Sequence, residues 1–146
     1  MDRNLFLYRF FGLVAAHFIS DILLNPAWLS RAKRKSSGIK RLGCLIGHCL
    51  IVTFVSYLFI LGWRSRACIG IAAAVGACHF AVDYVRVRIE PVVYRDGVAT
   101  IPKGTIISGR ARGDWWRINR LRWWAVNIGD QVAHIVCIIA IVRLSS

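Results

Sequence analysis

The sequence predicts an all-α membrane protein: a bundle of four transmembrane helices in a single domain, residues 1–146, with a small β-hairpin between the third and fourth helices. Two observations carry this prediction. The chain is 57% hydrophobic with a mean hydropathy of +0.54, which is too apolar for an ordinary soluble domain of this length. It also contains four apolar runs that reach the roughly 20 residues needed to cross a bilayer. These runs cover approximately residues 5–24, 42–63, 67–87 and 121–144.

The ends and composition of the runs support their assignment as helices. The first run stops before Asn25-Pro26, because proline disfavours a helical conformation in the residue before it. This run lacks the short apolar core and small-residue cleavage site of a signal peptide, so no cleavable leader is expected. The third run is rich in glycine and alanine, which allow helices to approach closely in lipid. The five cysteines have no CxxC spacing and are predicted to be buried, reduced thiols.

The segment of about residues 90–120 is predicted to be a cytoplasmic insert. Glu90-Pro91 is expected to end the third helix, and short runs of β-forming residues separated by glycine turns follow from Val92 to Ile107. This pattern predicts the β-hairpin, which is either a lid over a site or a surface insert with no part in the chemistry. Four tryptophans among arginines at 114–124 then indicate an interfacial segment that leads into the fourth run.

The basic residues are distributed in a way that predicts the orientation of the chain. Of the 20 lysines and arginines, six lie between the first two runs and nine lie between or at the edges of the last two. By the positive-inside rule, both basic loops face the cytoplasm and both termini lie outside. The expected partners are membrane lipids, with anionic headgroups on the basic loops. A nucleic-acid partner is not favoured, although tryptophans among arginines would also suit stacking on a strand.

All four histidines fall inside apolar runs, and three of them have an aspartate one helical turn away. Residues four apart lie on the same face of a helix, so both side chains of such a pair can reach one point. With the predicted orientation, every member of this set lies in the cytoplasmic half of the bilayer, within roughly 10 to 15 Å of depth. The set consists of His17, Asp21, His48, His79, Asp83, Asp130 and His134.

We expect this set to bind a divalent metal. An ionisable group near the middle of a bilayer costs on the order of 2.5 to 3.5 kcal/mol, and clustering around a cation removes that cost. Imidazole and carboxylate together favour zinc, with manganese, iron or magnesium as alternatives, and seven donors leave room for one or two ions. Asn127 and Gln131 continue the polar stripe of the fourth helix and are candidates to orient the metal ligands.

The order of these motifs resembles the family known as domain of unknown function 3307, which consists of small bacterial and phage inner-membrane proteins. The similarity covers nearly the whole chain except residues 91–116. Asn25 stands where such families usually have glutamine, so no role is assigned to it. A looser similarity to membrane-bound metal-dependent hydrolases, which place histidine and aspartate on transmembrane helices, implies hydrolysis. The residues that carry the family resemblance are His17-Phe-Ile-Ser-Asp21 with the segment 25–33, His48, His79-Phe-Ala-Val-Asp83, and Asp130-Gln131-Val-Ala-His134.

The leading hypothesis is a metal-dependent hydrolase that acts at the cytoplasmic leaflet on a lipid or another amphipathic ester, phosphoester or amide. Asp83 or Asp130 would be the catalytic base, and Arg86 with Arg88 would hold an anionic headgroup. One alternative is an ion or proton pathway without enzymatic activity. The other is a metal-stabilised membrane protein that binds a partner, such as a phage–host interaction protein.

Overall fold

The computed structural model describes residues 3–35, 38–61, 68–94 and 109–145 of the chain, and this part is helical, without a strand. Four helices are long and apolar enough to cross a membrane: Arg3–Leu23, Gly38–Ile60, Cys68–Val93 and Arg117–Leu144. This confirms the predicted number of spans. The elements are α1 (Arg3–Phe18), which continues into a π-helical turn η1 (Ile19–Leu23), then α2 (Ala27–Lys35), α3 (Gly38–Ile60), α4 (Cys68–Val93) and α5 (Gly109–Leu144).

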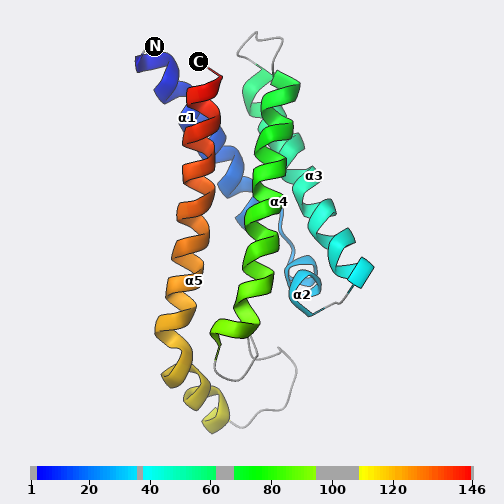
Figure 1. Cartoon of the computed structure of the whole chain (residues 1–146), viewed down its shortest axis with the longest axis vertical. Helices are drawn as coiled ribbons and strands as arrows, with labels where there is room; N and C mark the ends of the chain where they lie inside the picture. The colour runs from blue at the N-terminus through cyan, green and yellow to red at the C-terminus, as the bar shows by residue number, and fades with distance from the viewer. Residues whose placement is uncertain (1–2, 36–37, 62–67, 95–108, 146) are drawn as a thin grey trace.

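The four long helices form one bundle in which α1 and α4 each pack against α3 and α5 (Figure 1). Both termini lie at one end of the bundle, where the Arg9 guanidinium donates a hydrogen bond to the Ser145 carbonyl oxygen at 2.8 Å. The short helix α2 lies toward the opposite end and packs against α3. We refer to this second end as the α2 end.

The interior of the bundle divides into an apolar half and a polar half. The buried apolar cluster includes Leu13 of α1, Val52 of α3, Ile71 of α4 and Ile138 of α5. Each of these residues lies nearer the end with the termini than the histidine of its own helix does, so the polar half begins with the histidines and continues toward the α2 end. Outward-facing apolar side chains remain exposed, as expected for helices that face lipid.

Helices α3 and α4 lie in close contact at Gly76. A Cβ atom at this position would collide with the Thr53 hydroxyl, which itself donates a hydrogen bond to the Cys49 carbonyl oxygen at 2.8 Å. The absence of a side chain therefore allows this contact, in agreement with the packing role predicted for the small residues of the third run.

Helix α4 is longer than predicted, so its expected end at Glu90-Pro91 was wrong. The helix continues to Val93, and the Tyr94 amide donates to the Glu90 carbonyl oxygen at 3.1 Å. Proline removes only its own amide donor, and in a last turn this loss does not stop the following residues from staying helical.

The predicted insert is also shorter than expected. Val92 and Val93, the expected start of the β-hairpin, are helical, and α5 already begins at Gly109 instead of near residue 121. The described residues therefore give the hairpin no support. The remainder of the predicted hairpin, residues 95–108, lies outside the described part of the chain.

Candidate metal centre

The four histidines converge in the polar half of the bundle, each from a different long helix. His79 of α4 occupies the middle of the cluster, since its ring centroid lies 5.4 Å from that of His17, 5.0 Å from that of His48 and 4.2 Å from that of His134. All four residues are almost completely buried, with exposed fractions of 0 to 3%. The structure therefore brings together the histidines that sequence reasoning placed at one depth.

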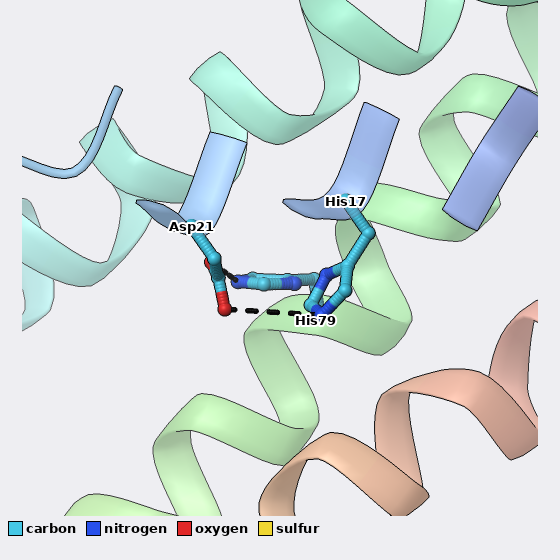
Figure 2. Close-up of side chains that lie close together, drawn as sticks. All are labelled: His17, Asp21 and His79. Carbon is cyan, nitrogen blue, oxygen red and sulfur yellow. Dashed lines mark ion pairs between the residues drawn. The ribbon is translucent and has the colours of Figure 1, made fainter. Parts of the chain in front are cut away.

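Three of the predicted ligands form a tight triangle of donor atoms. His48 Nε2 lies 3.0 Å from His79 Nε2, and the same Asp21 oxygen, Oδ1, lies 2.9 Å from His48 Nε2 and 3.4 Å from His79 Nε2. Figure 2 shows the Asp21 carboxylate directed toward the rings of His17 and His79. We call Asp21, His48 and His79 the donor triangle.

The position of Asp21 depends on η1. The Leu24 amide donates to the Ile19 carbonyl oxygen at 3.0 Å, a bond across five residues that defines a π turn. Within this turn the Ser20 hydroxyl donates to the Ala16 carbonyl oxygen at 2.8 Å. The wider turn thus places the Asp21 carboxylate against rings from α3 and α4.

The size of the donor triangle suits a transition-metal ion. A zinc ion held tetrahedrally at about 2.0 to 2.2 Å keeps neighbouring donor atoms about 3.3 Å apart. The three edges of the triangle are 3.0, 2.9 and 3.4 Å, so small side-chain adjustments would bring the atoms to this spacing. Two imidazoles and one carboxylate also leave a fourth position for water, the arrangement of catalytic zinc sites.

His17 lies beside the triangle as a possible further ligand. Its Nε2 atom is 3.9 Å from Asp21 Oδ2 and 3.2 Å from the Gln131 side-chain oxygen. Gln131, which was predicted to orient ligands, is therefore positioned to hold the His17 ring. In turn the Gln131 amide nitrogen donates to Asp130 Oδ2 at 3.2 Å.

Residues 9–146 match the family described as protein of unknown function, DUF3307. The chain belongs to this family. No match was found among curated proteins or among solved structures. For this DUF3307 protein, the geometry of the site is therefore the main source of functional inference.

Asp83, the second predicted aspartate, is paired with a lysine from α2. Lys33 Nζ donates to Asp83 Oδ2 at 2.7 Å, and both side chains are more than 90% buried. Asp83 Oδ2 also lies 3.9 Å from His79 Nε2, so the carboxylate borders the donor triangle. Sequence reasoning counted Lys33 among the basic loop residues and in segment 25–33 of the family resemblance, and gave it no role at the site. No sequence signal distinguishes it from the other basic residues of this loop.

Asp130 is held by Arg86, which we expected to bind substrate. Arg86 donates to Asp130 Oδ2 at 2.5 Å, to the Asn127 side-chain oxygen at 2.8 Å and to Glu90 at 3.0 Å. Asn127 therefore contacts the arginine and not a metal ligand. Glu90, the only glutamate in the sequence, is 2% exposed and was missed as a site residue, although it follows Arg86 by one helical turn.

The structure does not bring Arg88 together with Arg86. Arg88 donates to the Tyr84 hydroxyl at 2.9 Å on the exposed side of α4, and its guanidinium lies 5.1 Å from the centre of that ring. The two arginines predicted to hold one headgroup thus face different surroundings.

His134 has unused binding capacity. Its Nδ1 atom donates to the Asp130 backbone oxygen at 2.8 Å, whereas its buried Nε2 atom has no hydrogen-bond partner in the described structure. One oxygen of Asp130 is likewise buried and unpaired. Asp83, Asp130 and His134 each offer a ligand atom within 4.8 Å of the others, so a second ion is geometrically possible.

The charges of the site leave one carboxylate without a fixed cation. Lys33 neutralises Asp83, and Arg86 is shared by Asp130 and Glu90. Asp21 has only histidine rings as partners in the described structure. A metal ion bound at the donor triangle would compensate this negative charge.

A cavity of about 370 Å³ opens beside the donor triangle, between η1, α2, α4 and α5. Asp21 and Asp83 form part of its wall, whereas the Asp130 side chain does not line it. Asp21 of the triangle and Asp83 beside it therefore both border a space large enough for a small polar group.

Proposed function

We propose that this chain is a metal-dependent hydrolase of a bacterial inner membrane that acts on an amphipathic ester, phosphoester or amide at the cytoplasmic leaflet. The observation that carries the proposal is the donor triangle, since its two imidazoles and one carboxylate converge within 3.4 Å beside a cavity. A divalent ion, for which zinc is the leading candidate, would lower the pKa of a bound water and polarise the scissile group.

Asp83 is the better candidate for the catalytic base. Both Asp83 and Asp130 lie near a histidine of the cluster, but only Asp83 lines the cavity in which a substrate would meet the metal. The Lys33 ammonium would keep the Asp83 carboxylate ionised and in place. Asp130, held by Arg86 and Gln131, would have a positioning role.

The proposed orientation follows from the basic segments. Their described parts, residues 31–35, 38–41, 86–94 and 109–122, adjoin the α2 end of the bundle, where the cavity lies. The positive-inside rule would place this end at the cytoplasm with both termini outside. A substrate could then reach the cavity from the inner leaflet without leaving the membrane.

The distribution of polar residues favours a hydrolase over an ion or proton pathway. A pathway needs polar groups across the full membrane thickness. Here the half of the bundle near the termini has an apolar core that includes Leu13, Val52, Ile71 and Val142.

The test begins with purified protein in detergent. Elemental analysis should find about one zinc, manganese or iron per chain, and the loaded protein should hydrolyse members of a panel of lipid esters and phosphoesters. Asp83→Asn should retain the metal and lose hydrolysis. Ser56→Ala should retain both, because this buried hydroxyl lies outside the cluster and has no hydrogen-bond partner among the described residues. Metal-free, inactive protein that passes ions in a liposome flux assay would overturn the proposal.

A further inference from the structure

The cavity beside the donor triangle is lined by three cationic side chains: Lys33, Arg34 and Arg86. Two of them are already neutralised. Lys33 is paired with Asp83, and Arg86 is shared between Glu90 and Asp130.

Arg34 differs because no carboxylate pairs with it in the described part of the chain. Its guanidinium donates to the Ser30 carbonyl oxygen at 3.2 Å and to the Ser30 hydroxyl at 2.5 Å. These two bonds orient the side chain along α2 without cancelling its charge. The cavity wall therefore carries one guanidinium that is available to an anion, while the Asp21 carboxylate of the same wall faces the histidines of the donor triangle.

The cavity also provides groups suited to a polar headgroup. Ser30, Asn25 and Gln131 line it, and the Asn25 side-chain oxygen is buried without a hydrogen-bond partner in the described structure. A headgroup that enters could accept hydrogen bonds from Arg34 and donate one to Asn25.

Apolar residues of the same cavity suit the other end of an amphiphile. Phe18 and Ile22, from adjacent turns of α1 and η1, belong to the lining, and they are 41% and 69% exposed. On a membrane-spanning helix these exposed faces would meet lipid tails. A molecule with an anionic head in the cavity could therefore extend its acyl chains along Phe18 and Ile22.

We propose that the cavity binds the anionic, phosphate-class headgroup of an amphiphile, with Arg34 as the residue that recognises the negative charge. This inference deepens the proposed hydrolase function, since it defines the substrate class of the same site. The headgroup would lie in the space bordered by Asp21 and Asp83, next to the donor triangle.

The experiment is a binding titration of the full chain in detergent with three probes: dihexanoyl phosphatidic acid, dihexanoylglycerol, which lacks the phosphate, and inorganic phosphate. Phosphatidic acid should bind best. Arg34→Gln should weaken its binding by about tenfold or more, because one charge-assisted, bidentate contact is lost. Lys40→Met is the matched control, since it removes a positive charge from an exposed position of α3 near the same end and should leave affinity unchanged.

The possible outcomes are distinct. Equal affinity of wild type and Arg34→Gln for phosphatidic acid would overturn the assignment of Arg34, and equal binding of dihexanoylglycerol would overturn anion recognition. If inorganic phosphate bound as tightly as the lipid, the claim that the cavity selects an amphiphile would be refuted. Elemental analysis of the same samples separates these results from the hydrolase proposal, because an absent metal refutes the hydrolase while the titration still reports on Arg34.

Discussion

His48 and His79 place their Nε2 atoms 3.0 Å apart, and both atoms face one oxygen of Asp21. Two imidazole nitrogens this close must either share a proton or bind the same cation, because two unprotonated lone pairs repel each other. The following experiments distinguish these alternatives and test the ion pairs around the site.

Replacing His79 should abolish metal binding. His79→Ala removes the ring that belongs to the donor triangle and also borders Asp83, so metal content should fall from about one ion per chain to below a tenth. The measurement is elemental analysis after size-exclusion chromatography, with Ser56→Ala as the control. Undiminished metal content in folded His79→Ala would show that the ion binds elsewhere.

Removal of the metal should lower thermal stability. A ligand present at 100 times its dissociation constant stabilises the folded state by about 2.7 kcal/mol, so dialysis against a chelator should lower the Tm, and added zinc should restore it. The same treatment should leave the Tm of His79→Ala unchanged. An equal chelator effect on both proteins would indicate a cause other than this site.

The Lys33–Asp83 pair should be strongly coupled. Lys33→Met leaves Asp83 charged and buried, which should cost about 3 to 5 kcal/mol of unfolding free energy. Lys33→Met with Asp83→Asn should recover much of this loss, because no unpaired charge remains. A double-mutant cycle on denaturant unfolding in detergent measures the coupling, and additive effects would show that the pair is not energetically linked.

Arg86 and Arg88 should differ in their effect on stability although they are neighbours in sequence. Arg86→Met leaves Asp130 and Glu90 without their cation and should cost about 3 kcal/mol or more. Arg88→Met removes an exposed contact with Tyr84 and should change stability by about 0.5 kcal/mol or less. Comparable losses in thermal unfolding would contradict the separate placement of the two side chains.

Gly76 should not tolerate a methyl group. Gly76→Ala forces the Cβ atom into the Thr53 hydroxyl and should destabilise the α3–α4 contact by about 1 to 3 kcal/mol. Gly70→Ala is the matched control, since a Cβ atom there meets no atom of another described element within 4 Å and adds helix propensity. Equal Tm values for the two variants would rule out the close contact at Gly76.

The four spans could be predicted because run length and hydropathy alone define a helix that crosses lipid. The convergence of His17, His48, His79 and His134 could also be inferred, because alternating helix directions and a fixed rise per residue place them at one depth. Their donor atoms could not be assigned, since side-chain distances depend on helix rotation and packing.

The ion pairs that Lys33 and Arg86 form at the site could not be predicted from the sequence. Lys33 has the same sequence context as any lysine of a basic loop, and its burial depends on how α2 folds against α3. Arg86 was predicted to hold an anionic headgroup, whereas its ion pair with Asp130 forms across the α4–α5 interface, between residues 44 positions apart. The end of α4 was predicted too early because proline was taken to stop the helix, whereas it removed only one amide donor from the last turn.

Because of the π turn Ile19–Leu23, the position of the Asp21 carboxylate depends on the number of residues in this segment. If one residue were deleted between Phe18 and Leu24, the chain could wind as a regular α-helix, and each later side chain would rotate by about 100° relative to those before it. If the deleted residue precedes Asp21, its carboxylate would take the position of Ser20 and lose its contacts with His48 and His79. Family members could therefore keep every histidine and still lack the centre, so spacing around Asp21 is a better criterion for a working site than residue identity alone.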